Sequence, residues 1–289
     1  MDERTLTFTA ADGTDIHAYR WSPDGPAKAI VQIAHGMGEH AGRYRRLGEA
    51  LTEAGYVVYA NDLRGHGRTA GSPDNFGDLG SGGWSGLVSD LGALSEIARR
   101  EHPGIPLVVL GHSMGSFALQ QHLLEHGAEL DGAVLSGTTA VDVVAPSFEA
   151  TEDVDLSALN AAFEPARTEF DWLSRDPDEV DKYVSDAACG FGLNPDGTRG
   201  MLGVLSTFDS AALAKIPSSL PIYLVSGDDD PLAGGGPLVD LVGDRYREAG
   251  VLDVTVVRYA GARHEVFNET NRDEITAALI AWLDRVTAR

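Results

Sequence analysis

The stretch that decides the fold is residues 106–117, PLVVLGHSMGSF, where an apolar run passes through two glycines into a helix-forming segment. The run before the glycines is typical of a buried strand, and the segment after them is typical of a helix. Gly111, Ser113 and Gly115 form the pattern G-x-S-x-G at this junction. Side chains two residues either side of the serine would collide on so sharp a turn. The pattern therefore predicts a strained turn that exposes the Ser113 hydroxyl beside a helix N-terminus.

Strand-like and helix-like segments alternate on both sides of this turn, which is typical of an α/β fold. The expected strands are residues 5–9, 15–21, 29–34, 56–60, 106–110, 132–135, 221–226 and 254–257. The expected helices are residues 44–54, 84–100, 114–125, 238–248 and 274–285. We expect a mostly parallel central sheet with helices on both faces, preceded by an antiparallel strand pair.

The alternation stops between residues 138 and 219, where short amphipathic pieces with acidic links replace the strands. We interpret this segment, residues 138–219, as a helical cap inserted into an α/β core formed by residues 1–137 and 220–289. One large mobile loop is the alternative, although unstructured loops of this length are uncommon. The sequence has neither an internal repeat nor a long flexible linker that would divide the chain further.

The composition disfavours several classes of protein. The chain has 289 residues, with 22 Lys+Arg against 44 Asp+Glu, and the net charge of −22 disfavours binding to nucleic acid. The single cysteine, Cys189, cannot form an internal disulfide and cannot supply a metal cluster. The chain has no apolar run long enough for a membrane span, and its N-terminal residues do not resemble a signal peptide. We therefore expect a cytoplasmic protein.

A serine hydroxyl becomes an effective nucleophile only when a base takes its proton and a carboxylate orients that base. In folds with this strand-turn-helix junction, the base follows both the serine and the acid along the chain. After Ser113 the histidines are His122, His126 and His264. The first two fall on the helix after the turn and point away from its N-terminus. His264 follows an expected strand in a loop, so elimination selects it as the base.

The acid should lie in a loop after an earlier strand. Residues 227–231, GDDDP, follow an expected strand and contain three consecutive carboxylates. A divalent-metal loop is the alternative, but no further ligand spacing supports it. Adjacent like charges repel, so one of the three is expected to point inward. The residues alone do not choose among Asp228, Asp229 and Asp230.

Two backbone N–H groups near the nucleophile would stabilise the oxyanion of the reaction. One is expected from Met114, directly after Ser113. The other is expected from residues 35–40, HGMGEH, which follow an early strand and whose glycines permit a tight turn. These glycines also imitate a dinucleotide-binding loop. That alternative leaves the serine, the histidine and the aspartates unexplained.

Together these residues resemble the monoacylglycerol lipase/lysophospholipase branch of the α/β-hydrolases, which carries the family label serine aminopeptidase S33. The motifs that carry the resemblance are HGMGEHAGRY at residues 35–44, DLRGHG at 62–67, GHSMG at 111–115, GDDDP at 227–231 and His264-Glu265. The resemblance covers roughly residues 5–137 and 220–286, and within the cap it is limited to residues 167–175. It implies the α/β-hydrolase fold and a serine hydrolase that needs neither a cofactor nor a metal.

The resemblance also implies individual roles. It selects Asp230, three residues after the glycine that ends the strand, as the acid of a triad with Ser113 and His264. It implies Met37 and Met114 as the oxyanion-hole residues. The lipases commonly have a smaller residue at the position of Met37, so this side chain is expected to narrow or reshape the entrance.

Three further residues match positions at the polar end of the substrate pocket in the lipases. These are Glu39, Arg43 and His112, which the resemblance implies as substrate-binding residues. Glu39 and Arg43 have an alternative role as an ion pair at a helix start. Arg64 and His66, within DLRGHG, are expected to hold their loop in place rather than contact substrate.

The resemblance implies cleavage of carboxylic esters through an acyl-enzyme, with monoacylglycerol or a related medium-to-long-chain lipid ester as the leading substrate. A small-substrate carboxylesterase, an aminopeptidase and a receptor-like α/β-hydrolase with little turnover are the alternatives. The apolar cap residues either line an acyl pocket or pack the cap. They are Val143, Val144, Phe148, Leu156, Leu159, Phe163, Phe170, Trp172 and Leu173. The cap is also expected to make at most transient contact with membranes or micelles.

Overall fold

The computed structural model describes residues 1–147, 153–203 and 209–288. It contains an eight-stranded sheet in the order β1-β2-β4-β3-β5-β6-β7-β8. The strands are β1 (Asp2–Thr9), β2 (Asp15–Ser22), β3 (Ala29–Ala34), β4 (Tyr56–Asn61), β5 (Leu107–His112), β6 (Gly132–Ser136), β7 (Ile222–Gly227) and β8 (Val254–Tyr259). β2 pairs antiparallel with β1 and β4, and all other neighbours pair in parallel. The mostly parallel sheet is confirmed, with β1 beginning at Asp2 rather than Thr5.

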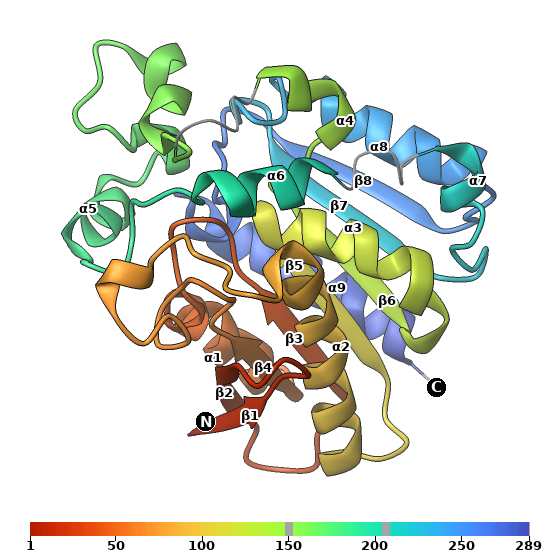
Figure 1. Ribbon diagram of the computed structural model, residues 1–289. Helices are drawn as coiled ribbons and strands as arrows, with labels where there is room; N and C mark the ends of the chain where they lie inside the picture. The colour runs from red at the N-terminus through yellow and green to blue at the C-terminus, as the bar shows by residue number, and fades with distance from the viewer. Residues whose placement is uncertain (148–152, 204–208, 289) are drawn as a thin grey trace.

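The helices lie on both faces of this sheet, as expected. They are α1 (Arg45–Glu53), α2 (Gly83–Glu101), α3 (Met114–His126), α4 (Val141–Val144), α5 (Pro177–Ser185), α6 (Pro195–Gly203), α7 (Ser210–Leu213), α8 (Pro237–Glu248) and α9 (Arg272–Thr287). One face is covered by α1 and α9, and the other by α2, α3 and α8 (Figure 1). Both faces are therefore shielded from water, as parallel sheets require.

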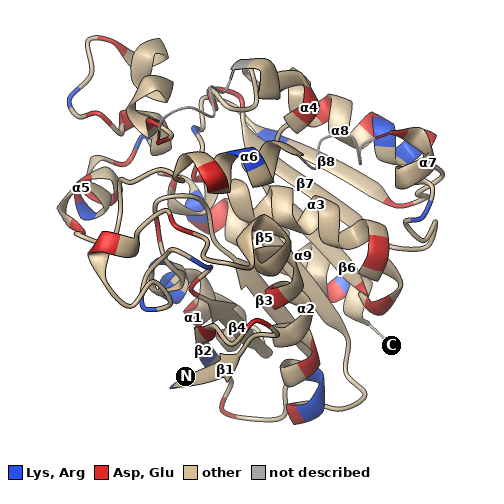
Figure 2. Cartoon of the chain, in the orientation of Figure 1, with Lys and Arg blue, Asp and Glu red and all other residues tan. Residues whose placement is uncertain are grey.

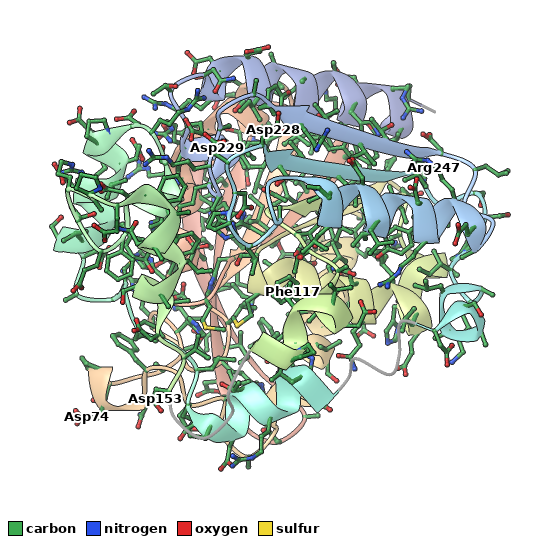
Figure 3. All side chains as sticks on the ribbon, turned by 90° about the horizontal axis from the view of Figure 1, so that it is seen from above. Asp74, Phe117, Asp153, Asp228, Asp229 and Arg247 are labelled. Atoms are coloured by element: carbon green, nitrogen blue, oxygen red, sulfur yellow. The ribbon has the colours of Figure 1, made fainter. Side chains whose placement is uncertain are left out.

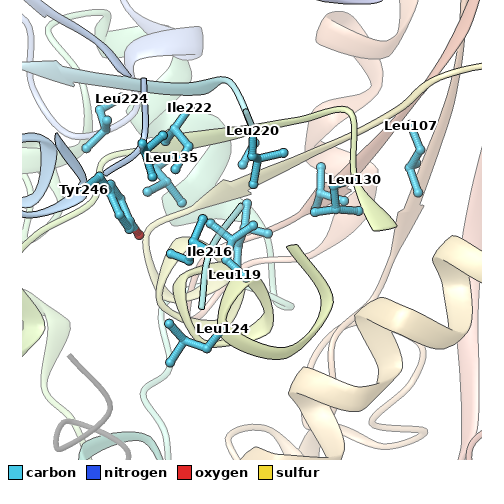
Figure 4. Close-up of a cluster of buried hydrophobic side chains, with 14 of the residues drawn as sticks. Leu107, Leu119, Leu124, Leu130, Leu135, Ile216, Leu220, Ile222, Leu224 and Tyr246 are labelled. Carbon is cyan, nitrogen blue, oxygen red and sulfur yellow. The ribbon is translucent and has the colours of Figure 1, made fainter. Parts of the chain in front are cut away.

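The central strands form the core. Every residue of β3, β4, β5, β6 and β7 is buried, and none of these strands contains a charged residue. On the side of α3 and α8, buried apolar side chains from helix and sheet meet in one cluster (Figure 4). Leu119 of α3, Leu135 of β6 and Tyr246 of α8 belong to it. The continuous apolar runs of the sequence are thus the strands that both helical layers cover.

The charged residues lie around this core, on the helices, the loops and the outer strands β1, β2 and β8 (Figure 2). Because the acidic side chains outnumber the basic ones two to one, they dominate this outer layer. Within the described part of the chain, no helix has both the length and the apolar character needed to cross a bilayer.

The segment between β6 and β7 is built differently from the rest. Its described residues form helices α4 to α7 and 3₁₀ turns, including η5 (Leu156–Phe163) and η6 (Asp171–Leu173), but no strand. Ion pairs fasten it to the residues around the start of α9: Arg175 contacts Glu269 at 2.8 Å, and Asp176 contacts Arg272 at 2.6 Å. The division of the chain into a core and an inserted cap stays a prediction, and we refer to residues 138–219 as the predicted cap.

Candidate active site

The turn between β5 and α3 has the strained backbone that its glycines predict. Ser113 has φ 50° and ψ −121°, and among the described residues it alone combines a positive φ with a side chain. A Cβ on Gly111 would lie 2.4 Å from the Gly115 carbonyl oxygen, and one on Gly115 would lie 2.2 Å from that of Ala34. Both contacts are with backbone, so only glycine fits. The surrounding structure thereby holds Ser113 in a conformation that costs about 1–3 kcal/mol.

The loops after β7 and β8 bring an aspartate and a histidine together. His264 Nδ1 lies 2.9 Å from Asp230 Oδ2, and both side chains are buried. The two neighbouring carboxylates face elsewhere (Figure 3): Asp229 is exposed, and Asp228 lies 3.7 Å from Arg258. Of the three consecutive aspartates, Asp230 is the one that contacts His264.

His264 is held between two other rings. Its centroid lies 4.7 Å from that of His112 and 4.8 Å from that of Trp172. Burial opposes the charged imidazolium, but the Asp230 carboxylate outweighs it and raises the pKa of His264 above its ordinary 6.5. Burial, with the nearby His264, lowers the pKa of His112 to about 4. His264 is therefore the ring that can gain a proton, while His112 stays neutral.

Ser113 and His264 both line a cavity of about 650 Å³. His112, Glu39 and Phe117 of α3 line it as well. This volume falls within the range typical of pockets for small organic ligands. The structure thus brings the serine and the histidine together on the wall of one cavity.

Most of the apolar cap residues named above either line the cavity or pack within the predicted cap. The members that line the cavity are Val144, Leu156, Leu159, Trp172 and Leu173. Phe163 and Phe170 pack within a small cluster of the cap, and Val143 is 47% exposed. Phe148 lies outside the described residues. Both expected uses of these side chains therefore occur, in different residues.

The expected oxyanion residues lie on either side of the serine. Met114 is the first residue of α3, and the leading N–H groups of a helix have no partner within it. Met37 lies in the loop after β3, and its side chain borders the cavity. A Cβ on Gly36 would lie 3.1 Å from Ser113 Cβ. The loop before Met37 therefore lies beside the nucleophile and leaves little room for a side chain at Gly36.

Glu39 and Arg43 belong to a buried polar network. Arg43 Nη1 donates to Glu39 Oε2 at 2.6 Å, and both of its Nη atoms donate to Glu265 at 2.6 and 2.8 Å. Glu39 Oε1 accepts the Gly36 N–H at 2.6 Å and the Tyr44 hydroxyl at 2.9 Å. Burial alone would raise the pKa of Glu39, but Arg43 and these hydrogen bonds hold it below its ordinary value. Arg43 is not among the residues that line the cavity, so it acts behind Glu39.

Arg64 and His66 hold their loop, as expected. Arg64 forms a buried ion pair with Asp90 at 2.7 Å and reaches Asp12 at 2.6 Å. His66 Nδ1 lies 2.7 Å from the Arg64 carbonyl oxygen. These contacts tie the loop after β4 to α2 and to the turn between β1 and β2.

The loop that bears His264 makes two contacts that were not predicted from the sequence. The N–H groups of His264 and Glu265 donate to the carbonyl oxygens of Trp172 and Leu173, at 3.4 and 2.8 Å. Glu265 also closes the network around Arg43. Both segments contain motifs that the sequence analysis quotes: His264-Glu265, and residues 167–175, which include Trp172. Neither motif indicates that the two segments contact each other.

The chain is similar to known proteins over most of its length. The model of the family described as serine aminopeptidase, S33 matches residues 25–271. Monoacylglycerol lipase of Mycolicibacterium smegmatis is 34% identical over 96% of this chain and 95% of the relative. Human monoglyceride lipase is 29% identical over 96% of this chain and 89% of the relative. The solved structure of a highly thermostable carboxyl esterase from Bacillus coagulans aligns with a TM-score of 0.88 and 30% identity, over 99% of both chains. The chain therefore belongs to the serine aminopeptidase S33 family and has the α/β-hydrolase fold.

Proposed function

We propose that this carboxylic ester hydrolase cleaves monoacylglycerols or related medium-to-long-chain lipid esters. The observation that carries the proposal is the cavity of about 650 Å³, in which Ser113 and His264 meet apolar side chains of the predicted cap. An acyl chain would lie against these apolar side chains, because burying each CH₂ group contributes about 0.8 kcal/mol. The names of the relatives from Mycolicibacterium smegmatis and human support the same substrate class.

In the proposed mechanism, Ser113 Oγ attacks the ester carbonyl while His264 Nε2 takes its proton. Asp230, hydrogen-bonded to Nδ1, orients the imidazole and stabilises its charged form. The N–H groups of Met37 and Met114 bind the developing oxyanion. His264 then protonates the leaving alcohol, and water attacks the acyl-enzyme with the same base. Apart from the ester and the water, these steps use side chains and backbone groups of the protein.

The polar end of the cavity is the proposed site of the alcohol group of the substrate. Glu39 and His112 line it and are positioned to contact hydroxyl groups. Arg43 serves this end indirectly, because its guanidinium holds the Glu39 carboxylate in place. Transient contact of the cap with membranes or micelles, the cytoplasmic location and the lack of nucleic-acid binding stay predictions from the sequence.

A panel of esters with acyl chains graded from acetyl to palmitoyl, together with monoacylglycerol, tests the substrate class. Maximal kcat/KM is expected on the medium-to-long chains. A maximum on acetyl or butyryl esters would favour the carboxylesterase alternative. Cleavage of aminoacyl amides in place of esters would favour the aminopeptidase.

Two adjacent cap residues test whether the apolar wall selects the acyl chain. Val144 lines the cavity, whereas its neighbour Val143 is 47% exposed. Val144→Trp is expected to fill part of the cavity and lower kcat/KM for palmitoyl esters by about tenfold relative to acetyl esters. Val143→Trp should leave this ratio unchanged. Equal effects of the two substitutions would mean that the wall does not set chain length.

The aspartate that orients His264 is tested by comparing three neighbours. Asp230→Asn is expected to lower kcat by about 10⁴-fold, because an amide neither holds the right tautomer nor stabilises the imidazolium. Asp228→Asn and Asp229→Asn, which do not contact His264, should change kcat by less than about threefold. A large loss in either of these variants would reassign the acid.

The pH dependence of kcat/KM follows from the raised pKa of His264. Only the neutral imidazole accepts the serine proton, so activity should rise with pH through this pKa, with its midpoint above 6.5. In Asp230→Asn the midpoint of this rise in the residual activity should shift to lower pH, because the carboxylate that favours the imidazolium is gone. Initial rates on a soluble ester across pH 5–9 in the two proteins measure the shift, and coincident midpoints would contradict it.

A further inference from the structure

A group of metal-ligand side chains lies outside the proposed catalytic residues, where the loop before α1 meets the turn after α5. Across the described ranges, His40, Asp186 and Cys189 are the one group whose ligand atoms, a ring nitrogen, a carboxylate oxygen and Sγ, all lie within 4.8 Å of one another. We propose that these three side chains bind a zinc ion. This site is separate from the proposed hydrolytic function and uses none of its residues.

The turn after α5 presents two of the ligands together. The Cys189 N–H donates to the Asp186 carbonyl oxygen at 3.0 Å, which closes a four-residue turn. The Ala188 N–H donates to Asp186 Oδ1 at 2.9 Å and fixes the carboxylate. Oδ2 stays directed at the third ligand. Two ligands separated by two residues on one turn is the spacing that protein zinc sites commonly use.

The third ligand, His40, comes from far away in the sequence. His40 Nε2 lies 3.0 Å from Asp186 Oδ2, across a separation of 146 residues. Two ligands bound to zinc at about 2.0–2.2 Å in tetrahedral geometry lie about 3.4 Å apart. The His40–Asp186 separation is therefore a few tenths of an ångström shorter than the required one. Cys189 Sγ lies within 4.8 Å of both atoms, so rotation of the three side chains would have to complete the coordination.

The donor set selects the kind of metal. A thiolate, an imidazole and a carboxylate suit zinc, whereas calcium and magnesium prefer oxygen ligands alone. Three protein ligands leave the fourth tetrahedral position to water. The side chains of His40 and Asp186 are 20% and 37% exposed, so an ion can enter from solvent. Binding forms the Zn–S bond and releases the thiol proton to solvent.

The position of the site gives the ion a structural consequence. His40 directly follows Glu39, in the loop that borders the cavity. The Gly190 N–H and the Tyr183 hydroxyl both donate to the Gly38 carbonyl oxygen, at 3.0 and 2.8 Å. A bound ion would add a further link between the same two segments. It would therefore fasten the predicted cap to the loop beside the serine.

Titration of zinc chloride into the metal-free full-length protein tests the site. Calorimetry is expected to give one ion per chain, and Tm should rise by a few degrees at about a hundredfold excess over Kd. Cys189→Ser and His40→Gln should each weaken zinc affinity by at least about 100-fold. His126→Gln is the matched control, because His126 contacts Glu129 at 3.0 Å in an exposed pair. It should bind zinc as the unaltered protein does.

Cobalt gives a second measurement that does not depend on any variant folding. Cobalt bound at this site should show thiolate-to-cobalt charge-transfer absorption in the near ultraviolet, since Cys189 is the only cysteine. This band should be absent from Cys189→Ser. The proposal is overturned if the band is absent from the unaltered protein. Unchanged zinc affinity in Cys189→Ser or His40→Gln, or equal loss in His126→Gln, would overturn it as well. None of these readouts involves ester hydrolysis.

Discussion

Ser113→Ala is expected to lower kcat for ester hydrolysis by about 10⁴- to 10⁶-fold and to leave the fold intact. Removing the nucleophile eliminates the acyl-enzyme route, while the oxyanion hole and the cavity retain a small residual rate. Alanine can occupy the same positive φ at a cost similar to that of serine, so stability should change little. Steady-state kinetics on a medium-chain ester and a thermal unfolding curve measure the two effects.

Ser185→Ala is the control for this substitution, because Ser185 is exposed and only caps the end of α5. It should retain the full kcat. A fluorophosphonate probe should label the unaltered protein and Ser185→Ala, but not Ser113→Ala. Retention of more than about a tenth of the activity in Ser113→Ala would refute the mechanism. Normal labelling combined with a persistent acyl-enzyme would instead favour the receptor-like alternative.

Arg43→Met is expected to give the largest loss of stability, about 3–5 kcal/mol in the free energy of unfolding. The side chains of Arg43, Glu39 and Glu265 are only 11%, 3% and 6% exposed. Removing the guanidinium leaves two carboxylates buried together without a counter-charge. Urea unfolding monitored by fluorescence and by circular dichroism measures this loss, with the slope m checked for constancy.

Arg285→Met is the matched control, because it removes an arginine from an exposed pair. Arg285 and Asp253 are 52% and 35% exposed, and such pairs contribute less than about 1 kcal/mol. Equal losses of unfolding free energy in the two variants would mean that the buried network contributes no more to stability than an exposed ion pair. The intact network holds the pKa of Glu39 below its ordinary value, so the network stabilises the protein at pH values above that ordinary pKa. This contribution is lost as pH falls through the lowered pKa. The difference in unfolding free energy between Arg43→Met and the unaltered protein should therefore narrow at low pH.

Local signals in the sequence predict the fold and the nucleophile Ser113. Gly111 and Gly115 flank a serine between a strand and a helix, and each glycine is required by a backbone contact. His264 follows by elimination, since the chain contains few histidines after Ser113. Asp230 could not be chosen among three adjacent carboxylates without the family resemblance, because which of them turns inward depends on the tertiary structure.

Contacts between distant segments could not be predicted. Arg43 and Glu265 are separated by 222 residues, and the sequence around neither residue indicates which side chain it pairs with. Within the predicted cap, Val143 and Val144 are neighbours with opposite environments. Short helices and 3₁₀ turns have too few residues to establish a hydrophobic period, so sequence spacing does not assign such side chains to a wall or to solvent.

The backbone hydrogen bonds from the His264 and Glu265 N–H groups to Trp172 and Leu173 limit how this enzyme can be re-engineered. Caps are natural candidates for transplantation between relatives, because they cover the pocket that receives the substrate. Here the transplanted piece would include the carbonyl oxygens that hold the N–H groups of His264 and Glu265. A chimera that replaces residues 138–219 would therefore have to keep residues 171–176 of this chain, or import the donor's matching base loop with its cap.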